Sequence, residues 1–279
     1  MKILNLALPA LAFIAFSPRI GLAVANGALQ NSPAKVEPVE HSFVIHNFRT
    51  ESGVVLPEAK IVYGTYGNLN AAGDNAILLP SHYMADMHDY EWLIGPGKAL
   101  DPTRQFLITS ELFGNGRSSS PSNTPEPFHG PRFPVTTIRD NVEAVHRLLT
   151  EELGVQHLHA VIGFSMGAQQ AFQWAVSHPA FMDCIVATSG TAKTYGHGIV
   201  RNESEINAIT TDEAFKGGDY TVEPEKGIQS FFLSGPHGFI RRNGGGRNSG
   251  RRTPQPARPW PRSSTTTART SFLTRTLTT

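Results

Sequence analysis

Residues 160–170 read AVIGFSMGAQQ and contain the pattern Gly-x-Ser-x-Gly between Gly163 and Gly167. An apolar run precedes the pattern and a helix-like run follows it, so we expect Ser165 at a tight turn between a strand and a helix. Small residues at positions 163 and 167 let the two backbones approach where a side chain would clash. The stretch therefore predicts a serine nucleophile, with an ordinary serine at a helix start as the alternative.

Strand-like and helix-like runs alternate around this stretch. The strand-like runs, which are β-branched, aromatic or continuously apolar, lie at 42–48, 59–67, 75–81, 105–113, 157–164 and 184–190. Apolar residues recur at helical intervals between Ile138 and Leu153, with Thr137 placed as an N-cap, and residues 166–179 form a second helical run. This alternation predicts a fold of the α/β class with a mostly parallel sheet.

The regular pattern weakens after Gly190 and is lost at about residue 228. Residues 228–279 are rich in Pro, Gly, Arg, Ser and Thr, a composition typical of disorder. No Asp or Glu follows Glu225, and our hypothesis is that the segment from about residue 228 is translated out of frame or through an intron. We therefore expect a folded domain over 43–227 and a disordered tail over 228–279.

The N-terminus has the features of a secretory signal peptide. A lysine at position 2 precedes an apolar run that ends at Phe16, and the small-residue triplet Ala23–Ala25 follows as a cleavage site. An uncleaved membrane anchor is the alternative, but the run is shorter than the roughly 20 residues that a spanning helix needs. We expect a signal peptide over 1–25, a linker over 26–42, a secreted or periplasmic protein, and no stable membrane insertion.

The net charge of the chain is near zero, but acidic and basic side chains are distributed unevenly along it. Residues 241–279 carry nine Arg and no Asp, Glu or Lys, whereas residues 1–240 carry 15 basic and 23 acidic side chains. An arginine-rich tail can bind nucleic acid or a membrane surface. Only Trp260 and Phe272 supply aromatic rings along this tail, so we expect a solvated segment and no nucleic-acid partner.

Cys184 is the only cysteine of the chain. No disulfide can therefore form within one molecule, even in an oxidising compartment. Because the residue lies in the predicted strand 184–190, we expect it to pack within the sheet rather than to act as a reactive thiol.

Several motifs occur together in one order along the chain: YGTYGNLN, LIGPGKALD, NGRSSSPSN, FPVTTIRDNVEAVHRLLTEELGV and VIGFSMGAQQAFQWAVSHP. Over residues 43–200 the sequence resembles the homoserine O-acetyltransferase-like family of α/β-hydrolase proteins. The resemblance implies an α/β-hydrolase fold, here truncated after about the sixth strand. It also implies that Ser165 takes an acyl group from a small ester or amide, without a cofactor, and passes it to a hydroxyl group or to water.

The same resemblance implies an oxyanion hole made of two backbone N–H groups. One belongs to the residue after the nucleophile, Met166, and the other to the loop after the third strand. That loop begins SHYMADMH here, whereas the family commonly shows H-A-L-T-G, and alignment on His82 places the second donor at Met84. The departure leaves the acceptor open between transfer to a hydroxyl group and hydrolysis.

This loop also offers a rival interpretation as a metal site. Carboxylates and imidazoles are suitable metal ligands, and four of them lie close together in the sequence: His82, Asp86, His88 and Asp89. The oxyanion loop accounts for His82 and Asp86, and no further clustered ligands complete the set. We therefore expect no metal site.

The catalytic acid and histidine that should follow the serine are not identifiable. The family order is Ser, then Asp or Glu, then His, but the later candidates Asp212, Asp219, His197 and His237 do not follow buried strand-like runs. The sequence therefore predicts a weakly active or inactive acyltransferase or hydrolase. A non-catalytic fragment or pseudoenzyme that binds acyl ligands is the alternative, and the oligomeric state stays open.

Overall fold

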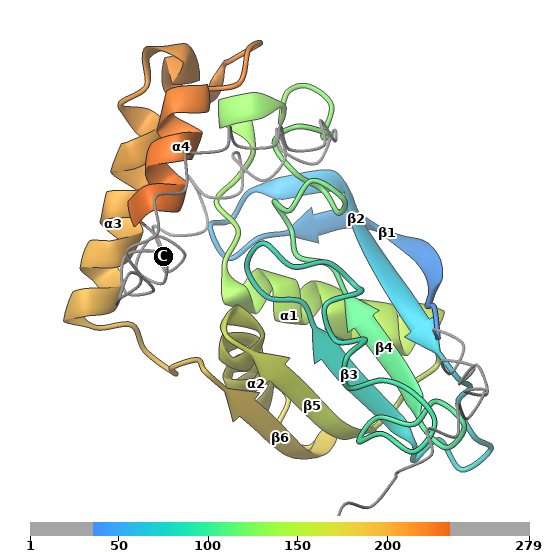
Figure 1. The fold of residues 1–279 in the computed structure, drawn as a ribbon. Coiled ribbons are helices and arrows are strands. Elements are labelled where there is room, and N and C mark those ends of the chain that lie inside the picture. Colours follow the sequence, from blue (N-terminus) through green and yellow to red (C-terminus); the bar gives the residue numbers. More distant parts are fainter. Residues whose placement is uncertain (1–35, 235–279) are drawn as a thin grey trace, which may run out of the picture. The chain divides into compact units, whose positions relative to one another are not determined.

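One six-stranded sheet organises residues 36–234, the part of the chain that the computed structural model describes (Figure 1). The strand order is β1-β2-β4-β3-β5-β6. The strands are β1 (Val39–Arg49), β2 (Val55–Tyr66), β3 (Ala76–Pro80), β4 (Phe106–Ser110), β5 (Leu158–Phe164) and β6 (Met182–Thr188). The helices are η1 (Gly130–Arg132), α1 (Ile138–Arg147), η2 (Leu148–Glu152), α2 (Met166–Ser177), α3 (Gly196–Thr210), η3 (Glu213–Gly218) and α4 (Glu225–Ser234).

The sheet is antiparallel at one edge and parallel elsewhere. β1 pairs antiparallel with β2, and β2 pairs antiparallel with β4. β4, β3, β5 and β6 are all parallel to their neighbours. Every residue of β3 and β4 is buried, as expected for strands covered on both faces. The predicted α/β fold with a mostly parallel sheet is confirmed.

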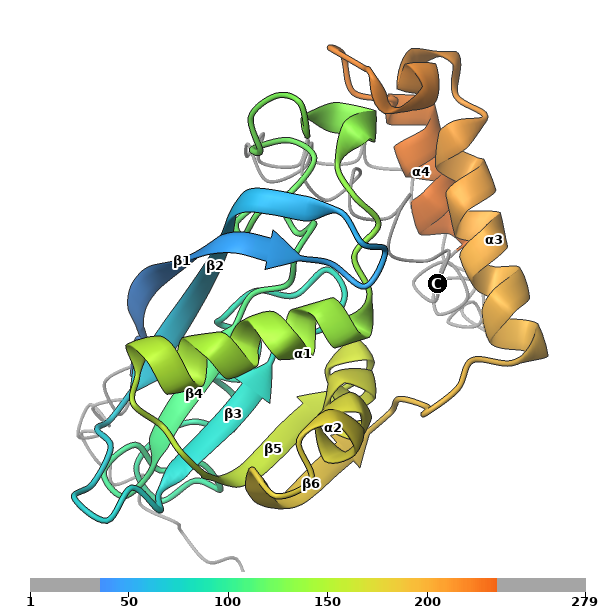
Figure 2. The same cartoon turned by 180° about the vertical axis from the view of Figure 1, so that it is seen from behind.

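The two faces of the sheet are covered by different parts of the chain. Helices α1 and α2 lie on one face, as Figures 1 and 2 both show, and Val145, Leu149 and Trp174 pack there against sheet residues. On the other face, Tyr90 and Leu100 of the long β3–β4 connection pack against β-strand side chains. The three parallel strands β3, β4 and β5 therefore lie between a layer of helices and a layer formed by the β3–β4 connection.

The first turn of α1 is stabilised by a capping box. The Thr137 side chain accepts a hydrogen bond from the Asp140 N–H, and the Asp140 carboxylate accepts one from the Thr137 N–H at 2.8 Å. Asp140 also accepts the Glu51 N–H at 2.7 Å, which ties the helix start to the β1–β2 turn. The N-cap predicted at Thr137 is confirmed.

β6 forms an edge of the sheet, since within residues 36–234 it pairs only with β5. Only Met182 among its residues is buried, and Val186 is 43% exposed. Cys184 is exposed as well. The expectation that Cys184 packs within the sheet is therefore wrong: among the described residues, Ile185 and Ala187 of β6 pack against the core, whereas Cys184 lies on the side of the strand that stays exposed.

The ordered elements extend past both predicted boundaries. β1 begins at Val39, inside the segment expected to be a linker, because Val39 pairs with Thr65 of β2. α4 continues to Ser234, and its Phe231 is buried against Ile209 of α3. The predicted end of the domain at residue 227 therefore falls inside a packed helix.

Several expectations lie outside the described residues. They concern the signal peptide over 1–25, most of the linker, the tail from residue 235 and His237. Within residues 36–234, no helix is both long enough and apolar enough to cross a membrane.

Candidate active site at the β5–α2 turn

Ser165 occupies a strained turn between β5 and α2. The strand ends at Phe164, the helix begins at Met166, and Ser165 between them has φ 54° and ψ −117°. A positive φ is unfavourable for a residue with a side chain and persists only where the surroundings hold it. The Ser165 N–H donates to the Thr188 carbonyl at 2.9 Å, so the neighbouring strand fixes this conformation.

Three glycines leave the space that this turn requires. A Cβ atom on Gly163 would lie 2.0 Å from the Gly167 carbonyl oxygen, and one on Gly167 would lie 2.6 Å from that of Pro80. A Cβ on Gly190 would lie 2.4 Å from the Ser165 carbonyl oxygen. The strand, the helix and the segment after β6 therefore approach more closely than side chains allow, which is the physical reason for the small residues around Ser165.

The loop that follows β3 carries Met84, the second expected oxyanion donor. Met84 has φ 60°, in a turn closed by a hydrogen bond from the Ala85 N–H to the His82 carbonyl at 3.0 Å. Among the described residues, the Met84 N–H donates no hydrogen bond. The Met166 N–H belongs to the first turn of α2, where N–H groups lack partners inside the helix. Both N–H groups are thus available to an anion, and their role as the oxyanion hole stays a prediction.

Two side chains fasten this loop to the β5–α2 turn. The Tyr90 hydroxyl donates to the Pro80 carbonyl at 2.9 Å and accepts the Phe164 N–H at 3.1 Å. Gln170 of α2 donates from its amide to the Ser81 carbonyl at 2.8 Å. Burial raises the pKa of Tyr90 to about 12, so its hydroxyl keeps the proton that it donates.

Tyr83, next to Met84, contacts both the turn and the helices that follow the sheet. It packs against Met166 on one side and against the cluster of Ile209 and Phe231 on the other. Its ring lies 6.4 Å from that of Phe231. Burial, and then the charge of Glu205, raise the pKa of Tyr83. The α3–α4 segment therefore borders the loop that carries Met84.

No histidine within residues 36–234 forms a hydrogen bond with the Ser165 hydroxyl. The ring of His82 lies 5.3 Å from that of Phe164, but its Nδ1 atom contacts the Tyr83 carbonyl at 3.1 Å. His197 is exposed on the first turn of α3. Neither ring therefore reaches the Ser165 hydroxyl in this structure.

The two later aspartates have other partners. Asp212 accepts the N–H groups of Ala214 and Gly227, at 3.0 and 2.8 Å, and so joins η3 to the start of α4. These hydrogen bonds lower its pKa. Asp219 is exposed and lies 3.6 Å from the Arg132 guanidinium. Both residues thus have structural contacts that do not involve Ser165.

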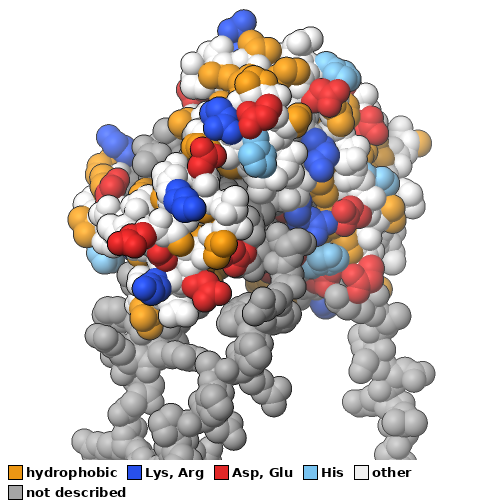
Figure 3. Space-filling model, turned by 90° about the horizontal axis from the view of Figure 1, so that it is seen from above, with side chains coloured by type: hydrophobic (Ala, Val, Ile, Leu, Met, Phe, Trp, Pro, Cys, Tyr) orange, Lys and Arg blue, Asp and Glu red, His pale blue; other side chains and the backbone are white. Residues whose placement is uncertain are grey.

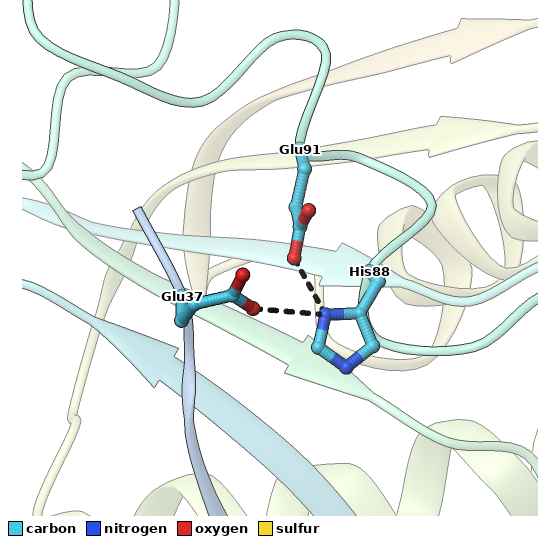
Figure 4. A group of neighbouring side chains, drawn as sticks. All are labelled: Glu37, His88 and Glu91. Atoms are coloured by element: carbon cyan, nitrogen blue, oxygen red, sulfur yellow. Dashed lines mark hydrogen bonds and ion pairs between the residues drawn. The ribbon is translucent and has the colours of Figure 1, made fainter. Parts of the chain in front are cut away.

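The four residues of the rival metal hypothesis do not converge on one point. Asp86 and Asp89 accept hydrogen bonds from N–H groups of their own loop. Within the described residues, the only three His, Cys, Asp or Glu side chains with all ligand atoms within 4.8 Å are Glu37, His88 and Glu91 (Figure 4). The His88 Nδ1 lies 2.5 Å from Glu91 and 3.8 Å from Glu37. A hydrogen bond and an ion pair account for this group without a metal.

Glu111 is a buried acid beside the site that the sequence analysis missed. It follows β4 directly, its side chain is 0% exposed, and its Oε1 accepts the Met87 N–H at 2.9 Å. Burial is the main cause that raises the pKa of Glu111 to about 7. One signal in the sequence could have identified Glu111: it is an acidic residue directly after the buried strand-like run of β4.

The surface around the described elements carries mixed charge. On the face in Figure 3, acidic, basic and hydrophobic side chains lie interspersed over the coloured atoms. Several large apolar side chains of α3 and α4 are exposed, among them Ile199, Val200 and Leu233. This mixture contrasts with the arginine-rich segment 241–279, which lies outside the described residues.

Comparisons with known proteins agree with this architecture. A family model described as the alpha/beta hydrolase fold matches residues 81–210. An ethyl acetate hydrolase of Pseudomonas veronii is 44% identical, over 61% of this chain and 49% of its own length. A homoserine O-acetyltransferase of Nautilia profundicola is 39% identical, over 61% of this chain and 50% of its own length.

A solved structure gives the same result. The acetylester hydrolase of Corynebacterium glutamicum superposes with a TM-score of 0.69 at 34% identity, over 70% of this chain and 57% of that one. The chain spans about half the length of the curated relatives it matches.

Proposed function

Because this chain is a homoserine O-acetyltransferase-like α/β hydrolase, we propose that Ser165 is the nucleophile of an acyl-transfer or hydrolysis reaction on a small ester or amide. The observation that supports the proposal most directly is the backbone of Ser165, which has φ 54° between β5 and α2. Strained backbone of this kind concentrates at functional sites. Both esterases and acetyltransferases occur among the relatives.

In the proposed reaction, the Ser165 hydroxyl loses its proton and its oxygen bonds to the carbonyl carbon of the substrate. The oxyanion that forms is stabilised by the N–H groups of Met166 and Met84. Its collapse breaks the bond to the alcohol or amine, which leaves with a proton. Water or a hydroxyl compound then attacks the acyl-serine and releases the product. No cofactor takes part in these steps.

The proposed reaction needs a group that accepts the Ser165 proton, and residues 36–234 place no histidine in contact with that hydroxyl. Because no described histidine hydrogen-bonds to the Ser165 hydroxyl, we propose that acylation by the described part of the chain uses water as the base. Loss of a triad member typically lowers turnover by about 10⁴- to 10⁶-fold. We therefore expect acylation by activated esters to be measurable and turnover of ordinary esters to be slow.

A fluorophosphonate probe tests the proposal, since its strongly electrophilic phosphorus reacts with a serine at an oxyanion hole even where ordinary esters turn over slowly. We expect labelling of the folded chain at one serine, and loss of that labelling in Ser165→Ala. Ser204→Ala is the matched control, because Ser204 lies on α3 and its hydroxyl bonds only to the Val200 carbonyl. Labelling that persists in Ser165→Ala would contradict the assignment of the nucleophile.

A second candidate is a non-catalytic protein that binds small acyl ligands. It is favoured by the lack of a histidine, within residues 36–234, that hydrogen-bonds to the Ser165 hydroxyl. This candidate predicts no labelling of the folded wild-type chain, together with a thermal shift on addition of a short-chain ester. The labelling experiment thus separates the two.

We also propose that the protein is exported, on the basis of the N-terminal sequence. Cleavage after Ala25 would leave Asn26 as the first residue. Mass spectrometry of the N-terminal peptide from the periplasm or the culture medium tests this. Full-length chain that stays inside the cell would contradict it.

A further inference from the structure

The carboxylate of Glu111 is surrounded by groups that donate hydrogen bonds or carry positive charge. Its Oε1 accepts the Met87 N–H at 2.9 Å, and its Oε2 accepts the Asn115 amide. The Arg117 Nε lies 3.4 Å from Oε1, and the Arg117 Nη2 contacts Glu40 of β1 at 2.6 Å. Because the Glu111 side chain is wholly buried, its carboxylate makes these contacts with protein groups alone.

The orientation of Asn115 is set by its other hydrogen bonds. Its Oδ1 accepts the N–H groups of Arg117 and Ser118, at 3.0 and 3.2 Å. The Nδ2 group must therefore face Glu111 as a donor. This amide is partly buried, and the second oxygen of Glu111 is the acceptor that it meets.

Two consecutive residues at the end of β4, Ser110 and Glu111, hold both ends of the segment that contains Met84. The Ser110 carbonyl accepts the Ser81 N–H at 3.0 Å, and the Glu111 carboxylate accepts the Met87 N–H. Between these two points the backbone makes the 82–85 turn, in which Met84 has a positive φ. A strained turn keeps its shape only when its ends are fixed.

We propose that Glu111 is a positioning residue for the reaction at Ser165, which acts by fixing the Met87 backbone and thereby the Met84 N–H that faces the substrate oxyanion. The inference rests on the proposed function of Ser165. Asn115 and Arg117 keep the carboxylate in place, and Glu111 itself does not touch the substrate.

The geometry suits the ionised carboxylate, because each of its oxygens faces a donor. A proton on either oxygen would point at a group that itself donates a hydrogen bond, so one of the two hydrogen bonds would be lost. Burial raises the pKa of Glu111 to about 7, the Met87 N–H and Arg117 lower it, and Asp86 raises it. Glu40 reaches the group only through Arg117.

Glu111→Gln tests the proposal in the full chain. A glutamine has one acceptor oxygen, so either Met87 or Asn115 loses its acceptor. The double variant Glu111→Gln/Asn115→Asp restores a donor–acceptor pair and keeps one negative charge beside Arg117. Glu126→Gln is the control, because Glu126 also pairs with an arginine, at 2.7 Å from Arg132, but has no contact with the segment 81–87.

Two readouts are measured for each variant: amide hydrogen exchange of the peptide 82–87, and the rate at which a fluorophosphonate labels Ser165. We expect Glu111→Gln to accelerate the exchange and to slow labelling by about 10- to 100-fold, less than removal of an oxyanion donor costs. The double variant should restore both readouts, and the control should change neither.

Unchanged exchange in Glu111→Gln would overturn the proposal. Faster exchange with an unchanged labelling rate would also overturn it, because the segment would then move without consequence for Ser165. A folded double variant that restores neither readout would count against it in the same way. A wild-type chain that is never labelled would refute the proposed function, whereas the exchange data would still show whether Glu111 holds the segment.

Discussion

The hydroxyl of Tyr90 accepts a hydrogen bond from the Phe164 N–H at 3.1 Å, immediately before Ser165 in the chain. The same hydroxyl donates to the Pro80 carbonyl at 2.9 Å. One side chain from the β3–β4 connection thus connects the ends of β3 and β5. Both strands lead into the candidate site, so this contact fixes their relative position there.

Tyr90→Phe should destabilise the protein and slow the labelling of Ser165. The substitution leaves the Phe164 N–H without its acceptor, and loss of such a partner at a buried site costs about 1–3 kcal/mol. Urea unfolding measures the change in the free energy of unfolding. Tyr195→Phe is the matched control, since Tyr195 is 69% exposed. Equal effects of the two variants would contradict the role of Tyr90.

Thr137→Ala should lower the free energy of unfolding by about 1 kcal/mol, the usual cost of removing an N-cap side chain. The lost oxygen accepts the Asp140 N–H in the capping box of α1. Urea unfolding again gives the measurement. Thr210→Ala at the end of α3, where the hydroxyl bonds only to the Ile206 carbonyl, should change stability less. The prediction fails if Thr137→Ala is neutral.

The stability of the protein should depend on the ionisation of Glu111. Its pKa is raised from 4.5 to about 7 in the folded state, so the folded protein holds this proton to higher pH than the unfolded chain. The contribution is therefore complete below pH 4.5 and is lost as the pH rises to about 7. Relative to Glu111→Gln, the wild type should lose up to about 3 kcal/mol over this window, measured by urea unfolding at a series of pH values.

Glu126 provides a control of opposite sign for this pH dependence. Its hydrogen bond with Arg132 lowers the pKa of the carboxyl. Its contribution is therefore present above the unfolded pKa and lost as the pH falls, and it should be small because the pair is exposed. A Glu111→Gln variant with the same pH dependence as the wild type would contradict the assignment to Glu111.

Within residues 36–234, β6 is an edge strand that pairs only with β5. This edge should promote self-association, because unpaired N–H and C=O groups on an edge strand can pair with another chain. Val186→Lys should reduce aggregation, since a charged edge residue blocks such pairing. Val176→Lys is the matched control: Val176 is 74% exposed but lies on α2. Light scattering at rising protein concentration compares the two. Equal improvement by both variants would indicate general solubility and not the edge.

Local patterns in the sequence were enough to locate most of the secondary structure. Continuous apolar runs predicted β3, β4 and β5, and the helical spacing after Thr137 predicted α1. These signals work because burial on one or two faces imposes its own period on the sequence. The turn at Ser165 was likewise expected from glycines that lie only a few residues apart.

The contacts that support the site depend on residues far apart in the sequence. The Glu111 carboxylate accepts the Met87 N–H, and the Tyr90 hydroxyl accepts the Phe164 N–H at the end of β5. The periodicity of polar and apolar residues along the sequence reveals neither contact, because only the tertiary structure brings these residues together. The exposure of Cys184 was missed for a related reason, since it depends on what covers β6 and not on the strand itself.

The dependence of Ser165 on β6 affects the order in which the site can form during synthesis. The Ser165 N–H bonds to the Thr188 carbonyl, and Gly190 packs against the Ser165 carbonyl oxygen. The positive φ of Ser165 is therefore held by residues that leave the ribosome after it. A nascent chain that has exposed α2 but not β6 should carry the serine in a relaxed, unreactive turn. Ser165 would take its final conformation only when the chain has emerged past Gly190.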